Sequence, residues 1–249
     1  MNEQRVPRIF SVPRRANRLA RSLTLARGKS PARWLFEEME QDCIERLEFM
    51  RFEPARALLA GPASSALGSV LSDRGAEVSL IAQYDEEKPI VDAPFDLIVS
   101  LARLDTVNDL PGALLHTRMA LNEGGLFIGQ MVGAGSLPML RQLMLAADAE
   151  RPAARIHPQV DNRAATALLE RAGFARQVVD SQSLNVSYRS LDRLVADLRE
   201  QGLTNVLADP PPPLGKAGLA RARDAFDALK DSEGRVNETF EILTLTGWR

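Results

Sequence analysis

The segment from residue 57 to residue 68, ALLAGPASSALG, joins a short apolar run to a helical pattern through a turn of small residues. An apolar run of this length that ends at Gly61 and leads into a helix is typical of a buried strand. A second short strand, residues 77–82, follows as soon as Gly75 stops the helix. Strand, helix and strand in immediate succession predict a βαβ unit, and therefore a parallel sheet.

The alternation continues along the chain with one gap. Residues 95–100 (FDLIVS) predict a fully buried central strand, and a helix opened by Pro111 leads to the next strand at residues 125–130. Between Ala82 and Phe95 the chain is polar and broken by prolines. That stretch is too short for a crossover helix and another strand, because such a connection needs about a dozen residues by itself. We therefore expect a sheet that lacks one βα unit.

The second half of the chain is richer in helical patterns. Ser136 is expected to cap a helix of about fifteen residues, and Asp161 and Ser190 are expected to cap two others. These patterns predict a helical lobe contributed by residues of about 136–172 and 190–231.

Three further apolar segments predict strands near the C-terminus. Residues 178–179 and 184–188 indicate two strand pieces, and residues 239–248 alternate apolar and polar side chains. Such alternation is typical of an antiparallel strand with one solvated face. Together the patterns predict an α/β protein with a mostly parallel sheet and one antiparallel C-terminal strand.

Composition excludes several classes of function. A net charge of −2 gives no general basis for nucleic-acid binding, and no apolar stretch approaches the length of a membrane span. With Cys43 as its single cysteine, the sequence can form neither an internal disulfide nor a cysteine-cluster metal site. With only two histidines, no zinc site is expected either. No metal ligands are therefore predicted, and a reducing cytoplasm is the simplest setting.

The N-terminal segment differs from the rest in charge. From Met1 to Trp34 there are nine arginine or lysine residues and one acid, Glu3. We expect residues 1–30 to form a basic, flexible arm and residues 31–249 to form the α/β domain. Three interpretations stay open: a solvated or partly docked arm, a surface for an acidic partner protein or a membrane, and a targeting segment of the mitochondrial transit type.

Several short motifs occur in order along the chain: FDLIVS (95–100), VNDLP (107–111), LNEGGLFIG (121–129), LLERAGF (168–174) and the final GW (247–248). Their order and spacing resemble the class I S-adenosylmethionine-dependent methyltransferase superfamily. Within it, the chain is most similar to the branch of malonyl-carrier-protein methyltransferases and the assembly factor 5 of NADH:ubiquinone oxidoreductase. The resemblance implies a Rossmann-like sheet, here shortened by one βα unit and extended by an N-terminal helical arm.

The resemblance also implies where S-adenosylmethionine would bind. Such proteins carry Gly-x-Gly-x-Gly after the first strand; Gly61 matches the first glycine, whereas Ala63 and Ser65 stand at the other two. Gln83 stands where a carboxylate would accept both ribose hydroxyls, and Asp85 reaches that place only if its loop bends back. We interpret these five residues as a vestigial cofactor site, with S-adenosylmethionine or no cofactor bound there.

Other polar residues near this site are interpreted as ordinary. Arg103 and Asp105 are read as loop charges, with a polar pair at the cleft mouth as the alternative, and Asp85, Glu86 and Glu87 are read as a solvated face. No catalytic residue is predicted, because no nucleophile–base motif is present.

Two functional hypotheses remain. The first is a degenerate, non-catalytic methyltransferase-like protein that works in protein assembly of the respiratory complex I type through its surface. The second is an active S-adenosylmethionine-dependent methyltransferase, or a relative that modifies protein arginine. The sequence favours the first, in a bacterial cytoplasm or alternatively in the mitochondrial matrix, and no nucleic-acid partner is expected.

Overall fold

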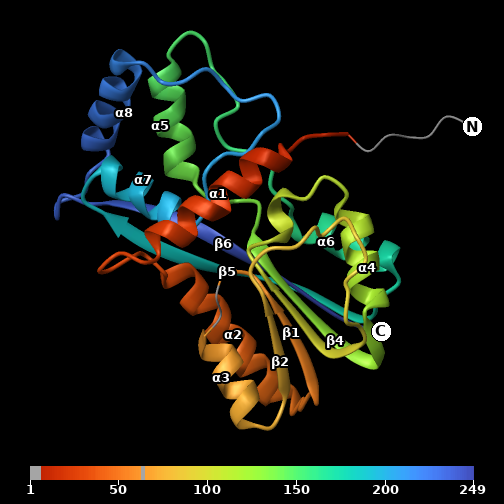
Figure 1. The fold of residues 1–249 in the computed structure, drawn as a ribbon. Coiled ribbons are helices and arrows are strands. Elements are labelled where there is room, and N and C mark those ends of the chain that lie inside the picture. The colour runs from red at the N-terminus through yellow and green to blue at the C-terminus, as the bar shows by residue number, and fades with distance from the viewer. Residues whose placement is uncertain (1–6, 63–64) are drawn as a thin grey trace, which may run out of the picture.

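The computed structural model describes residues 7–62 and 65–249. Within them, six strands form a single mixed sheet (Figure 1). The strands are β1 (Arg56–Ala60), β2 (Glu77–Ile81), β3 (Phe95–Leu101), β4 (Leu121–Val132), β5 (Ala175–Tyr188) and β6 (Val236–Trp248).

The sheet order is β2-β1-β3-β4-β6-β5. Strands β1 to β4 pair in parallel, whereas β6 runs antiparallel to both β4 and β5. The predicted fold class is confirmed, including the missing unit: the chain passes from β2 to β3 through a loop without a strand, so β2 is an edge of the sheet.

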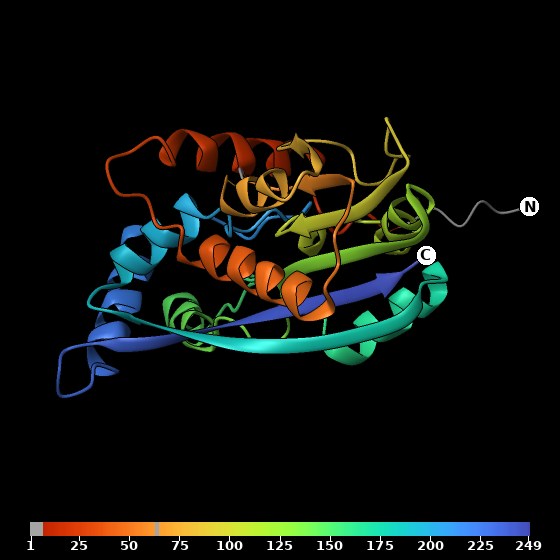
Figure 2. The ribbon, with the colours of Figure 1, turned by 90° about the horizontal axis from the view of Figure 1, so that it is seen from below.

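Helices cover both faces of the sheet and build a lobe at one end (Figure 2). They are α1 (Val12–Leu25), α2 (Trp34–Met50), α3 (Ser65–Asp73), α4 (Leu110–Met119), α5 (Pro138–Asp148), α6 (Asn162–Ala172), α7 (Leu191–Glu200) and α8 (Lys216–Ala228), with a short 3₁₀ turn η1 (Leu104–Thr106).

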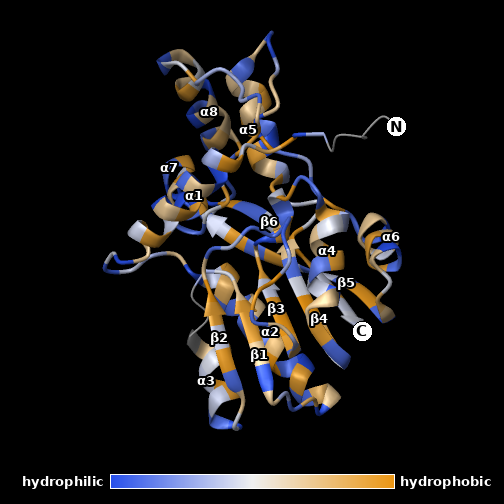
Figure 3. Cartoon of the chain, turned by 45° about the vertical axis from the view of Figure 1, so that its right-hand side comes forward, coloured by the Kyte–Doolittle hydropathy of each residue, from blue (hydrophilic) through white to orange (hydrophobic). Residues whose placement is uncertain are grey.

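The strand side chains alternate between two buried layers. Leu58 and Ile98 pack on the face covered by α4 and α6, whereas Leu59 and Val99 pack on the face covered by α2 and α3. Both faces of β1 and β3 are therefore apolar, as Figure 3 shows by colour. This double burial explains why these strands read as continuous apolar runs in the sequence.

Two expected element boundaries are wrong. Ser136 does not cap α5: its hydroxyl donates to Gly133 O, and the backbone N–H groups of Met139 and Leu140 donate instead to the buried carboxylate of Glu238 on β6. The two strand pieces at residues 178–188 are one continuous strand, β5, because β6 pairs with it along nearly its whole length. In both cases a distant segment decides the local structure.

The basic N-terminal segment forms helix α1. Its first turn is capped by the Ser11 hydroxyl, which accepts from the Arg14 N–H, and contains a proline. Just before α1, the backbone N–H and C=O of Phe10 bond to the side-chain amide of Asn108. The helix contacts α7 and lies across the carboxyl ends of the parallel strands (Figure 1).

Candidate functional site

A cavity of about 390 Å³ lies between α1 and the carboxyl ends of β1, β2 and β3, and we call it the strand-end cleft. Open α/β sheets bind ligands at this edge, and the volume is in the range of small-molecule sites. The strand side of the cleft is lined by Pro62, Gln83, Tyr84, Asp85, Glu86, Glu87, Ala102 and Arg103.

Gly61 is required by the neighbouring strand. Its N–H donates to Ile81 O at 3.1 Å, and its φ of +153° is one that other residues rarely adopt. A Cβ at this position would lie 2.8 Å from Leu101 O on β3. Crowding by β3 therefore accounts for the glycine without a ligand. Ala63 and the side chain of Ser65, two of the predicted site residues, lie outside the described residues.

The N-terminus of α3 is occupied by a carboxylate of the chain itself. Glu40 on α2 is buried, and its Oε2 accepts from the Ala66 N–H at 3.2 Å. Burial raises the pKa of Glu40, while hydrogen bonds from the Ala66 and Leu67 backbones oppose that rise. A helix N-terminus attracts anions, so Glu40 takes the place that an anionic group of a ligand would have.

Glu40 is not among the predicted site residues, although the sequence carries a signal for it. Phe36, Glu40, Cys43 and Leu47 follow one another at spacings of four, three and four residues. Glu40 therefore stands within the apolar stripe of α2, where an acid needs a specific buried partner.

Gln83 and Asp85 both line the strand-end cleft, and both are exposed. Asp85 accepts from the Glu87 N–H at 3.2 Å and pairs with Lys88 at 3.1 Å. Its carboxylate therefore serves the turn of its own loop. The neutral Gln83 leaves the end of β2 without the charged acceptor that the resemblance requires.

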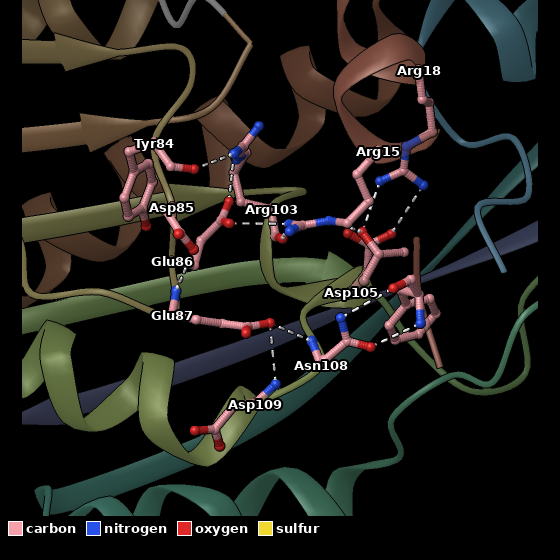
Figure 4. Close-up of polar contacts among 12 residues, drawn as sticks. Arg15, Arg18, Tyr84, Asp85, Glu86, Glu87, Arg103, Asp105, Asn108 and Asp109 are labelled. Atoms are coloured by element: carbon pink, nitrogen blue, oxygen red, sulfur yellow. Dashed lines mark hydrogen bonds and ion pairs between the residues drawn. The ribbon is translucent and has the colours of Figure 1, made fainter. Parts of the chain in front are cut away.

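Glu86 is buried, which corrects the expectation of a solvated acidic face. Only 2% of the residue is exposed. Its carboxylate lies 2.5 Å from the guanidinium of Arg103 and 3.1 Å from that of Arg15 on α1 (Figure 4). The neighbouring Glu87 accepts from the N–H groups of Asn108 and Asp109, so it ties the same loop to the start of α4.

Arg103 and Asp105 are also more than loop charges. The Arg103 guanidinium donates to Ala82 O and Tyr84 O, and it lies 5.7 Å from the centre of the Tyr84 ring. Burial raises the pKa of Tyr84 to about 12. Asp105 does not pair with Arg103; it lies 3.8 Å from Arg18 on α1.

Two arginines of α1 point toward the strand ends and fasten the helix there (Figure 4). Arg15 donates to Thr106 Oγ1 at 3.1 Å and to Arg103 O at 3.2 Å, and Arg18 donates to Thr106 Oγ1 at 2.9 Å. Burial lowers the pKa of Arg18, an effect that Asp105 opposes. We call this network the α1 latch; it consists of Arg15, Arg18, Glu86, Arg103, Asp105 and Thr106.

Residues 7–62 and 65–249 contain neither a metal cluster nor a membrane span. No group of three or more histidine, cysteine, aspartate or glutamate side chains there is arranged to hold a metal ion. No helix in the same residues is both long enough and apolar enough to cross a bilayer.

The parallel strands, the two helical layers and the cleft at the strand ends define a Rossmann-like protein of the methyltransferase type. A family model described as "Methyltransferase domain" matches residues 15–179, about two thirds of the chain. The chain therefore belongs to this methyltransferase-domain family.

Curated relatives agree with this assignment. The chain is 33% identical to the zebrafish (Danio rerio) mitochondrial arginine-hydroxylase NDUFAF5 over 66% of this chain and 53% of that protein. It is 25% identical to a malonyl-[acyl-carrier protein] O-methyltransferase of Gallionella capsiferriformans over 96% of this chain and 92% of that protein. The match thus spans about half the length of the arginine-hydroxylase relative.

The fold is similar to that of a putative methyltransferase from Bacillus halodurans, with a TM-score of 0.50 and 11% identity over 82% of this chain and 97% of that one. At this level of identity the likeness concerns the fold alone.

The residues around the strand-end cleft do not fit S-adenosylmethionine as the resemblance would place it. Glu40 occupies the N-terminus of α3, and Asp85 turns to Lys88. The buried carboxylate nearest the end of β2, Glu86, is held by two arginines. Among the residues that the structure describes, the polar positions that would receive the cofactor are neutral or already paired within the chain.

Proposed function

We propose that the chain is a non-catalytic methyltransferase-like protein that acts in protein assembly of the respiratory complex I type through its surface. The α1 latch is the observation that carries this proposal. Arg15 and Arg103 share the buried Glu86 carboxylate, and this charge-assisted pairing fastens a helix over the cleft. Such bonds are about twice as strong as neutral ones. A ligand that needed Glu86 would have to break them.

The outer face of α1 supports a role through the surface. Arg15 and Arg18 face the cleft, whereas other basic residues of this region are exposed and the helix contains no acid. The exposed set, which we call the basic face, is Arg8, Arg14, Arg21, Arg27 and Lys29. Clustered cations of one sign attract and orient acidic surfaces. We propose an acidic protein subunit as the partner, in a bacterial cytoplasm or alternatively in the mitochondrial matrix.

Isothermal titration of the full chain with S-adenosylmethionine tests the loss of cofactor binding. We expect no heat of binding at ligand concentrations up to about 1 mM, the limit of weak affinity. A malonyl-carrier-protein methyltransferase relative, titrated with the same ligand stock, serves as the positive control. Saturable binding in the micromolar range would overturn the proposal.

The partner is tested by cross-linking in native cells. Arg21→Glu combined with Arg27→Glu is expected to abolish the cross-linked species, while the matched reversal Arg163→Glu on α6 leaves it intact. Vesicles with anionic lipids provide a second arm. Sedimentation of the wild type with these vesicles, and not with a protein partner, would contradict an acidic subunit.

A second candidate function is an active S-adenosylmethionine-dependent enzyme, and one observation favours it. The strand-end cleft keeps a volume of about 390 Å³ beneath α1. If α1 opens, this space admits a small molecule. In that case the double variant Arg15→Ala/Arg18→Ala binds S-adenosylmethionine more tightly than the wild type does. Equal absence of binding in both proteins excludes this function.

A further inference from the structure

A second cavity of about 380 Å³ lies between α5, α7 and the segment that leads to α8, and we call it the lobe cavity. It is separate from the strand-end cleft. The ion pair between Arg18, which lines the cleft, and Asp105, which lines the lobe cavity, lies between the two spaces. The lobe cavity has no part in the cofactor positions discussed above.

Most of the cavity wall is aliphatic. The lining includes Leu140, Met144, Val195, Leu198, Leu203 and Leu219. Protein interiors leave few voids larger than a water molecule, and apolar voids are poorly filled by water. A space of this size and lining is therefore suited to an aliphatic ligand, which restores dispersion contacts to the wall.

Two polar atoms at the wall lack partners. Asp105 Oδ1 and His157 Nδ1 are buried, and neither has a hydrogen-bond partner among the described residues. Only 8% of the Asp105 side chain is exposed, and its other oxygen faces Arg18. Burial lowers the pKa of His157, so the imidazole is neutral at pH 7. Buried polar groups are almost always paired, so this pair of atoms calls for a polar group from a ligand.

We propose that the lobe cavity binds a medium-chain aliphatic molecule with a neutral head group, such as a primary amide, that donates to Asp105 Oδ1 and accepts from His157 Nδ1. The charge of Asp105 is balanced by Arg18, and Arg155 in the cavity wall is paired with Asp148, so a charged head group gains no free counter-charge from either residue. Arg199 also lines the cavity but is exposed to solvent, where an ion pair contributes little. The aliphatic tail lies against α5 and α7. This site is independent of whether the strand-end cleft binds a cofactor.

Isothermal titration of the full chain with octanamide, hexanamide and octanoate tests the proposal. We expect one octanamide site, with about fifteenfold weaker binding of hexanamide, because it lacks two methylenes and each buried methylene contributes roughly a fourfold gain in affinity. Octanoate is expected to bind more weakly than octanamide, because its carboxylate cannot donate a hydrogen bond to Asp105 Oδ1 and is repelled by the Asp105 carboxylate. No binding of any amide, or octanoate binding as tight as that of octanamide, would overturn the proposal.

Variants locate the site. Leu219 lies on the wall and is 36% exposed, so Leu219→Trp can fill the cavity with little strain on the core, and we expect it to abolish octanamide binding. Val178→Trp, at a half-exposed position on β5, is the matched control and should bind as the wild type does. Should Leu219→Trp fail to fold by circular dichroism, Val195→Phe in the same wall replaces it.

The affinity of the variant His157→Leu for octanamide tests the contact with the head group. His157→Leu is expected to weaken octanamide about five- to tenfold, the value of one neutral hydrogen bond. It should leave the ratio between octanamide and hexanamide unchanged, because the tail contacts remain. Wild-type affinity in His157→Leu, or in the cavity-filling variant, would contradict the assigned site.

Discussion

The carboxylate of Glu86 lies 2.5 Å from the guanidinium of Arg103, and both residues are more than nine-tenths buried. Arg15 reaches the same carboxylate from α1. One carboxylate thus pairs with two arginines at the edge of the sheet where ligands of this fold class bind. Glu86 and Arg103 therefore hold α1 against the sheet and are not free to bind a ligand.

Removal of the Glu86 charge is expected to be costly. Glu86→Gln leaves the buried guanidinium of Arg103 and the partly buried one of Arg15 with one neutral neighbour. Breaking a buried pair in this way costs about 3 kcal/mol of the free energy of unfolding. Urea denaturation measures the loss. The control is Asp85→Asn on the same loop, which removes an exposed pair with Lys88 and should change stability by less than about 1 kcal/mol. Equal effects of the two variants would show that Glu86 is not the centre of the latch.

The latch should control the opening of α1. In Arg15→Ala/Arg18→Ala, the helix loses its charge-assisted bonds to the strand ends, so we expect the amides of residues 12–25 to exchange with deuterium about tenfold faster. Arg21→Ala, which removes an exposed arginine of the same helix, should leave exchange unchanged. Unaltered exchange in the double variant would mean that the remaining contacts, with α7 and through Phe10 and Asn108, hold α1 without the latch.

Gly61 should tolerate alanine poorly even without any ligand. The added Cβ meets Leu101 O at 2.8 Å, in addition to the strain of a positive φ. We expect Gly61→Ala to lower the free energy of unfolding by about 3 kcal/mol. Gly75 also has a positive φ, +92°, but open space around it, so Gly75→Ala should cost only about 1 kcal/mol. Thermal denaturation of both variants distinguishes crowding by Leu101 of β3 from the strain of a positive φ. Equal losses of unfolding free energy in the two variants would show that β3 does not crowd position 61.

His157 should make stability depend on pH. Its pKa is lowered from 6.5 by burial, so below about pH 6.5 the unfolded chain binds a proton that the folded chain does not. Stability therefore falls as pH drops below 6.5, until the lowered pKa of the folded state is reached. In His157→Leu this part of the dependence disappears. Urea denaturation of both proteins from pH 8 to pH 5 measures the difference; parallel curves would contradict a buried neutral histidine.

Local signals in the sequence were sufficient for much of the fold. Asp161 and Ser190 cap α6 and α7 as expected, because their side chains bond to backbone N–H groups three residues away. The shortened stretch between Ala82 and Phe95 correctly indicated a missing unit. Where a distant residue supplies the partner, as Glu238 does for α5, the local pattern pointed to the wrong cap.

The candidate site was less predictable for the same reason. Position directly after β2 predicts Gln83 and Asp85 as the site residues, but the buried acid of that loop is Glu86. Its partners come from α1 and from the residues that follow β3. Asp85, Glu86 and Glu87 are three successive acids, and their residue types do not indicate which of them is buried. Glu40 was different, because its place in the apolar stripe of α2 was readable.

The latch has a consequence for how the molecule is made. Arg15 and Glu86 are 71 positions apart, and Arg18 and Thr106 are 88 apart. Contacts between such distant positions form only after long loops have closed. Helix α1 is synthesised before its partner residues Glu86, Arg103 and Thr106, which emerge from the ribosome much later. During translation the basic helix therefore remains available to other surfaces until the strands that will hold it have been made.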